Sequence, residues 1–189
     1  MKILPLSAAV LLACLITGPA DARVRNVTDA NAPRSLATEG PVQVDWTDPA
    51  QFSDIRFSGN RWEAQRGNWV QQLAQHLQNR ATAQLPAGET LQVTFTDIKR
   101  AGQFEPWRGH NLQDTRIVRE IYPPHIELSF KRLDAQGNVI DQGERRLRDT
   151  GFMMGSSSVM NSDPLRFEKR MLDDWLRREL RADAALSVR

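Results

Sequence analysis

Apolar and polar residues alternate along four segments of the chain, which is the pattern of strands that bury one face. The clearest segment is 91–96, where Leu91, Val93 and Phe95 alternate with polar residues. The same alternation is present in 42–46 and 126–131, and more weakly in 139–148. A turn-forming run at 134–138 joins the last two segments, so the pattern predicts a β-hairpin there.

Two further segments have the apolar period of an amphipathic helix. The first is 63–83, and the second begins at Ser162 or Asp163 with Pro164 at its first position. The apolar faces carry Trp69, Val70, Leu73, Leu77 and Ala81 in the first helix, and Leu165, Met171, Leu172, Trp175, Leu176 and Leu180 in the second. Mixed strands and helices predict an α+β fold, a single domain in which two helices pack on one face of a mainly antiparallel sheet.

Composition adds limits on the class of protein. The chain has 189 residues, of which 40% are hydrophobic and 25% charged, as in an ordinary globular protein. The net charge is only +2 and the two signs are mixed along the sequence, which argues against nucleic acid as a partner. We place the single domain at 41–182 and a C-terminal tail at 183–189.

The first 22 residues predict export. Lys2 precedes an apolar run, and an A-x-A site ends at Ala22, which is the pattern of a cleaved signal peptide. We therefore expect a periplasmic protein with no membrane span after cleavage. Cys14 keeps an alternative open, since it lies in a lipobox-like context where a lipoprotein would be anchored. The polar residues 23–40 predict a flexible N-terminal arm.

A long irregular loop at 101–125 attracts a functional interpretation, because loops of this length inside a domain are often functional. An exposed Trp beside Arg suits stacking on a sugar or on a partner's side chain. The partner would be another envelope protein or a polysaccharide. The structural alternative is that Trp107 and Tyr122 pin the loop to the sheet. The candidate binding residues are Trp107, Arg108, His110, Arg116, Arg119, Tyr122 and His125.

Catalytic and metal-binding patterns are weak in this sequence. It contains no nucleophile motif and no phosphate-binding glycine loop, so we assign no catalytic residue, no cofactor and no metal. One alternative is a hydrolase of an envelope polymer, with Asp97, Glu105 and His125 in acid and base roles. The other is a periplasmic copper protein that uses the histidines together with Met153, Met154 and Met160, because thioethers bind soft Cu(I). We expect Asp173 and Asp174 to form a solvated face paired with arginines.

Several segments together are similar to one known family. They are Leu85–Gly88, Phe95–Ile98, Ala101–Trp107, Arg116–Pro124, Leu147–Asp149 and Glu168–Trp175. In these residues the chain resembles the Domain of Unknown Function 3016 family of exported proteobacterial proteins, over about residues 41–182. The resemblance implies an exported, single-domain protein and supplies no activity, substrate or cofactor. The sequence therefore favours a non-enzymatic binding or adaptor domain that uses the 101–125 loop.

Overall fold

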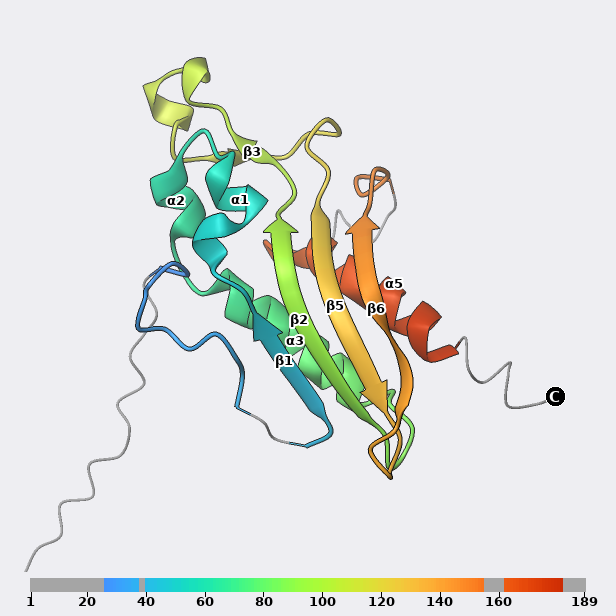
Figure 1. Ribbon diagram of the computed structural model, residues 1–189. Helices are drawn as coiled ribbons and strands as arrows, with labels where there is room; N and C mark the ends of the chain where they lie inside the picture. The colour runs from blue at the N-terminus through green and yellow to red at the C-terminus, as the bar shows by residue number, and fades with distance from the viewer. Residues whose placement is uncertain (1–25, 38–39, 155–161, 182–189) are drawn as a thin grey trace, which may run out of the picture.

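A four-stranded sheet forms the centre of the protein. A computed structural model describes residues 26–37, 40–154 and 162–181. The strands are β1 (Val42–Trp46), β2 (Thr90–Lys99), β5 (His125–Leu133) and β6 (Val139–Arg148), in the order β1-β2-β5-β6. β1 runs parallel to β2, and the other neighbours are antiparallel (Figure 1). The predicted α+β class and the mainly antiparallel sheet are confirmed.

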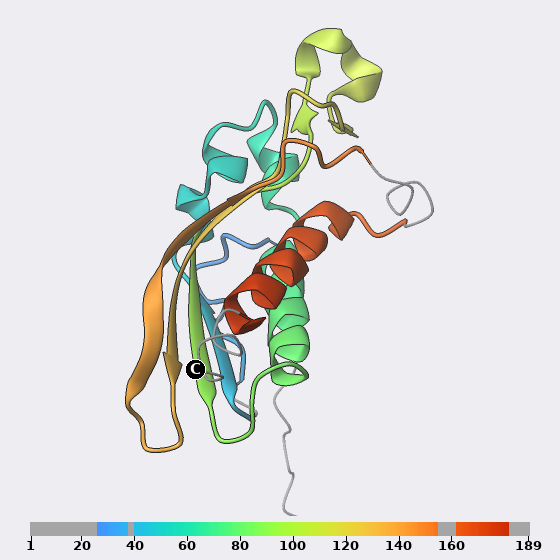
Figure 2. The same ribbon diagram turned by 90° about the vertical axis from the view of Figure 1, so that its right-hand side faces the viewer.

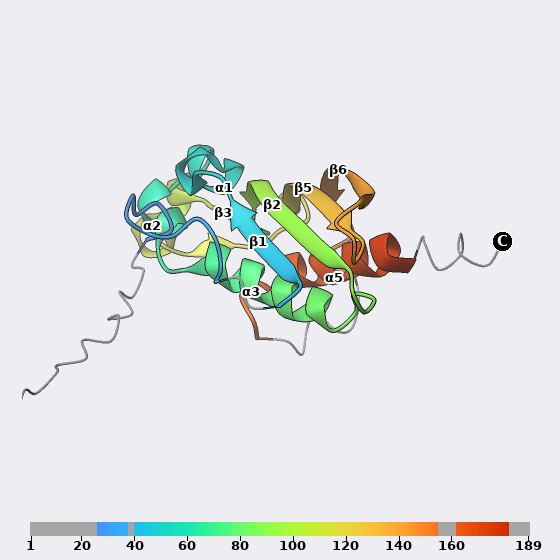
Figure 3. The same cartoon turned by 60° about the horizontal axis from the view of Figure 1, so that its bottom comes forward.

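Helices α3 (Trp69–Thr82) and α5 (Arg166–Arg181) cover one face of this sheet, as the sequence predicted. Figures 2 and 3 show the two layers, with both helices on the same side of the strands. The strands alternate buried and less buried residues, because every second side chain points into the space between the layers. The predicted core tryptophans Trp46, Trp69 and Trp175 are buried there, and the Trp175 ring meets the edge of Phe130 at 5.8 Å.

The helix predicted at 63–83 is broken into two. It consists of α2 (Arg61–Gln65) and α3, separated at Gly67, whose φ of +83° belongs to the left-handed region that favours glycine. The side chain of Asn60 caps α2 by accepting from the Glu63 amide at 3.1 Å. A short helix α1 (Ser53–Arg56) and the 3₁₀ turn η1 (Pro49–Gln51) precede α2.

The prediction of a flexible arm is wrong for residues 26–37. Val27 and Leu36 are buried in the core, and the Leu36 amide donates to the carbonyl of Val44 at 3.0 Å. Ser35 also forms an isolated antiparallel bridge with Asp45, beside β1. Two widely spaced apolar residues give no periodic signal in the sequence, yet each fills a place in the core. The signal peptide, the tail at 183–189 and residues 155–161 lie outside the described residues.

The second face of the sheet is polar and is not covered by α3 or α5; we call it the open face (Figure 2). It has a shallow hollow of about 450 Å³ over β2, β5 and β6. The hollow is lined by Gln92, Thr94, Ser129, Phe130, Lys131, Gln142, Gly143 and Glu144.

One end of the sheet carries most of the irregular structure, and we call it the loop end. It comprises α1, α2, residues 99–124 and the segment 149–154 after β6 (Figure 1). Within 99–124, the short strands β3 (Gln103–Phe104) and β4 (Arg116–Ile117) pair with each other. Between them lie the 3₁₀ turns η2 (Pro106–Arg108) and η3 (His110–Leu112). The candidate binding residues of the sequence therefore sit on this end.

Candidate functional site

A buried carboxylate fixes the root of the loop. Asp54 on α1 is 1% exposed and accepts hydrogen bonds from the side chains of Arg100 and Arg116 at 2.8 to 3.0 Å. Burial opposes ionisation of Asp54, but the two guanidinium groups outweigh it and hold the pKa of the carboxyl below its usual value. Arg100 also stacks over the Trp69 ring at 4.3 Å, and Arg116 over the Phe104 ring at 4.8 Å. The cluster ties α1, β2 and β4 together.

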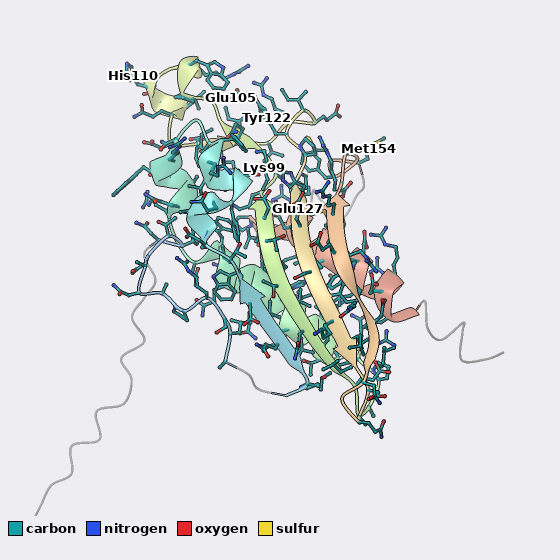
Figure 4. All side chains as sticks on the ribbon, viewed as in Figure 1. Lys99, Glu105, His110, Tyr122, Glu127 and Met154 are labelled. Atoms are coloured by element: carbon teal, nitrogen blue, oxygen red, sulfur yellow. The ribbon has the colours of Figure 1, made fainter. Side chains whose placement is uncertain are left out.

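A second buried carboxylate organises the loop itself. Glu105 is 2% exposed, and Arg108 and Arg119 reach its Oε2 at 2.6 and 3.2 Å. The Tyr122 hydroxyl donates to Oε1 of Glu105 at 2.9 Å, and this bond raises the pKa of Tyr122. Figure 4 shows Glu105 and Tyr122 facing one another inside the loop end. Glu105 thus holds together residues that are up to 17 positions apart in the chain.

Glu168 supports the loop from beneath. It is fully buried on α5, and its Oε1 accepts from the Ala101 amide at 2.6 Å. Burial raises the pKa of the Glu168 carboxyl, because its ionised form loses the hydration that it would have in water. Beside it, the rings of Phe152 and Phe167 meet edge to face at 4.8 Å. The root of the loop therefore rests on a small apolar cluster and one carboxyl group.

The Asp97 carboxylate contacts the hydroxyl of Ser53 and the imidazole of His125 at the loop end of the open face. The backbone amide and the hydroxyl of Ser53 each donate to Asp97 at 2.6 Å, and Nε2 of His125 lies 3.0 Å from Oδ2. Burial opposes ionisation of Asp97, but the hydrogen bonds from His125 and Ser53 outweigh this effect and lower the pKa of its carboxyl group. The hydroxyl proton of Ser53 is committed to a weakly basic carboxylate and not to the imidazole. This arrangement lacks the contact between nucleophile and base that activates a catalytic serine.

The loop end turns apolar side chains to solvent. Trp107 on η2 is 68% exposed and Ile121 is 70% exposed. Most of the exposed large apolar residues of the described chain share this end: Phe57, Trp62, Trp107, Leu112, Val118, Ile121, Met153 and Met154. Val139 and Ile140 are exposed at the opposite end of the sheet, next to the β5–β6 turn. The exposed apolar surface is therefore concentrated where the loop is.

The α1–α2 turn and the loop form one continuous surface. The Asn60 amide donates to the Gln113 carbonyl and to Asp114 at 3.2 and 2.9 Å. A Cβ atom at Gly59 would come within 2.4 Å of the Phe104 carbonyl, so only glycine allows this close approach. Phe57 and Trp62, from the turn and from α2, therefore lie on the same surface as Trp107.

The structure divides the seven candidate binding residues between different partners. Arg108, Arg119 and Tyr122 meet at Glu105, Arg116 belongs to the Asp54 cluster, and His125 contacts Asp97. Trp107 and His110 are exposed, with His110 at the far tip of the loop (Figure 4). Most of the charged candidates thus hold the loop in place, while Trp107 presents its ring to solvent and does not pin the loop.

Sequence reasoning missed the residues that anchor this site. Glu168 interrupts the apolar face of the second predicted helix, and a charge in that position was the available signal. Asp54 lies in a segment where no helix was predicted. Lys99 and Arg100 lie three and four residues after the strongest predicted strand, 91–96. Asp173 was also wrongly expected to pair with neighbouring arginines. It instead accepts from Arg80 at 3.1 Å and contacts His76 at 2.9 Å, which links α5 to α3.

The geometry gives little support to the hydrolase alternative or to the copper alternative. The hydrolase candidates Asp97 and His125 are in contact, but Glu105 is engaged separately by Arg108 and Arg119. In the described ranges, no group of three or more His, Cys, Asp or Glu residues could hold a metal ion. Of the copper candidates, Met153 and Met154 are exposed after β6, and Met160 lies outside the described residues.

Comparison with known proteins gives a family without an activity. The chain belongs to the family described as "Protein of unknown function (DUF3016)", whose model matches residues 40–178. No curated protein and no solved structure matches the chain. Across the part of the chain that the structure describes, no helix has the length and apolar character that a membrane crossing needs.

Proposed function

We propose that this protein is a non-enzymatic binding module of the bacterial cell envelope, and that it docks another envelope protein through the apolar side chains of the loop end. One observation carries the proposal. Eight of the ten exposed large apolar residues of the described chain lie at the loop end, where Trp107 is 68% exposed although the nearby Glu105 is only 2% exposed. The signal-peptide pattern in residues 1–22 supports the place of action.

The exposure of these apolar side chains at the loop end has an energetic meaning. A monomer gains nothing by holding Trp107 and Ile121 in water, and a concentration of exposed apolar side chains is typical of interaction sites. Trp and Arg are also the residues most enriched at the energetic centres of protein interfaces. The ion pairs at Asp54 and Glu105 fix the backbone that carries the apolar groups. A fixed loop loses little conformational entropy on binding, which favours affinity.

The charge balance favours a protein over an anionic membrane as the partner. Residues 53–62 and 97–124 carry seven Lys and Arg against five Asp and Glu. Attraction to anionic lipids increases with each uncompensated cation near the surface, so a nearly balanced face gains little from a membrane. A protein surface can match both signs and the apolar side chains together.

Site-specific photo-crosslinking in cells tests the proposal. A photoreactive residue replaces Trp107 in one variant and Val139, an exposed apolar residue at the opposite end, in the control. We expect one envelope protein to crosslink from position 107 and not from 139. The purified partner should then bind Trp107→Ala at least about tenfold more weakly than the wild type and bind Val139→Ala unchanged.

Two results would overturn the proposal. One is equal crosslinking from both positions. The other is binding to phosphatidylglycerol vesicles without a protein crosslink, seen as a blue shift of tryptophan fluorescence that Trp107→Phe removes. That result would assign the loop end to a membrane.

A further inference from the structure

Lys99, the last residue of β2, is a half-buried cation without a direct partner. Its side chain makes no hydrogen bond or ion pair with any residue that the structure describes. Burial lowers the pKa of Lys99 and outweighs the attraction of Asp54 and Asp97, while the neighbouring Arg116 and Arg100 add to the lowering. A partly buried ammonium group without an anion costs free energy, so its place calls for an explanation.

The nearby carboxylates are already occupied. Asp54 receives both Arg100 and Arg116, and Asp97 receives Ser53 and His125. On the next strand Glu127 pairs with Arg146 at 3.3 Å. Turning Asp54 or Glu127 toward Lys99 would leave an arginine without its partner. Asp54 and Asp97 attract Lys99 without contacting it, so an anion from another molecule is able to pair with it directly.

Two more basic side chains stand beside Lys99 across the sheet. His125 on β5 is its register partner, and Arg148 on β6 is the register partner of His125. Opposite residues of neighbouring strands point to the same face with Cβ atoms about 5 Å apart. Lys99, His125 and Arg148 therefore form one row across the open face, at the edge next to the loop end. Arg148 is exposed and has no ion pair within the described ranges.

The next row along the same face shows why this row is different. It contains Asp97, Glu127 and Arg146, in which Arg146 has its carboxylate partner. The Lys99 row has three basic groups and no acidic one. Figure 4 shows Lys99 at the loop end of β2, above Glu127 and below the loop that carries Glu105 and Tyr122.

We propose that Lys99 and Arg148, which flank His125 in this row, form an oxyanion site, which receives a carboxylate of the protein that docks at the loop end. This inference rests on the proposed function and adds the chemistry of the partner: it presents an Asp, a Glu or a free C-terminus beside its apolar contact residues. Lys99 would approach the carboxylate as a point charge from one side, and the guanidinium of Arg148 would donate from the other.

Lysine NMR tests the site without knowledge of the partner. The described chain contains Lys99, Lys131 and Lys169, so reductive ¹³C-dimethylation of the protein, which keeps the positive charge, gives few signals. Lys131 is exposed and Lys169 pairs with Asp163 at 2.5 Å, which makes them internal controls. Acetate, and separately inorganic phosphate, are titrated at constant ionic strength.

We expect acetate to shift the Lys99 signal in a saturable way and to raise the pKa of Lys99, while Lys131 and Lys169 do not respond. Arg148→Gln should weaken this response about tenfold, because it removes a charged donor. Arg146→Gln is the matched control, since Arg146 already has a partner, and should leave it unchanged.

Three results would contradict this proposal, and they can be told apart. No shift, or equal shifts of all three lysines, would mean an adventitious ion only and would overturn the site. Saturation by phosphate and not by acetate would overturn the carboxylate assignment in favour of a phosphorylated ligand. If the partner crosslinked at position 107 binds Lys99→Met as tightly as the wild type, the docking proposal stands and the carboxylate site fails.

Discussion

The two halves of this protein use charge in opposite ways. Where the sheet meets α3 and α5, apolar residues such as Val44, Leu73 and Leu172 fill the interior. The contact between the two helices is completed at its rim by Asp173 with His76 and Arg80. At the loop end the carboxylates of Asp54, Glu105 and Glu168 lie inside beside a small apolar cluster, while Trp107 and Ile121 lie outside.

This difference separates two sources of order. Burying apolar area stabilises the layered half by about 25 cal/mol per Å², and small defects in it have graded costs. A buried charge cluster stabilises a structure only as a complete set, because one missing partner leaves an uncompensated charge. The loop end therefore owes much of its shape to buried charges, and apolar residues such as Trp107 and Ile121 remain free for a partner.

The largest effect is expected from Asp54→Ala. It removes the shared partner of Arg100 and Arg116 and leaves two largely buried guanidinium groups without their carboxylate. We expect a loss of about 3–5 kcal/mol in the free energy of unfolding, measured by urea denaturation. The control is Asp173→Ala, which breaks a partly exposed ion pair in the layered half and should cost about 1 kcal/mol or less. Equal losses would contradict the contrast between the two regions.

A smaller and more local effect is expected from Glu105→Gln. An amide keeps the shape of the side chain but gives up the charge that attracts Arg108 and Arg119. We expect a loss of about 1–3 kcal/mol and faster amide hydrogen exchange confined to residues 106–121. The pKa of Tyr122 should fall toward its ordinary value, because its bond to the Glu105 carboxylate is what raises it. Uniformly faster exchange throughout the sheet would instead show that Glu105 stabilises the whole fold and not the loop alone.

A third effect depends on pH. The pKa of Glu168 is raised in the folded protein, so the fold binds this proton more tightly than the unfolded chain does. Its contribution to stability is complete below the unfolded pKa near 4.5 and is lost as pH rises through the higher folded value. Asp54 and Asp97 have lowered pKa values, so their contribution is present above 3.8 and is lost as pH falls through the folded values.

Glu168→Gln should therefore flatten the decline of unfolding free energy with rising pH above 4.5, measured by urea denaturation at a series of pH values. The slope is the quantity to compare, because the new amide changes the absolute stability at every pH. An unchanged slope would show that the Glu168 carboxyl does not titrate differently in the folded and unfolded chains.

The smallest effect on folding is expected from Trp107→Ala. Its ring is mostly in solvent, so the free energy of unfolding should change by about 0.5 kcal/mol or less. Trp175→Ala, in the layered half, should cost about 3–5 kcal/mol, because that ring is buried against Phe130. Thermal unfolding of the two variants gives the comparison. A large loss for Trp107→Ala would make the ring a structural element of the loop.

Prediction from the sequence succeeded where apolar residues repeat. The alternation in 91–96 and the face containing Leu172 and Trp175 located β2 and α5, because these periods follow directly from strand and helix geometry. It failed where a few residues act singly. Gly67 breaks a helix that the apolar period predicted to be continuous, and Val27 joins the core from a segment that is otherwise polar.

For the candidate site, the sequence determined which residues are present and which segment carries them: an irregular loop with Trp107 beside Arg108 and with further arginines downstream. Only the tertiary structure decided that Arg116 joins Asp54, 62 positions away, and that Lys99, His125 and Arg148 share one row. The physical reason is that the apolar period is a local property of the chain. The partner of a charge depends on strand register and on which elements meet, and these are fixed only when the core packs.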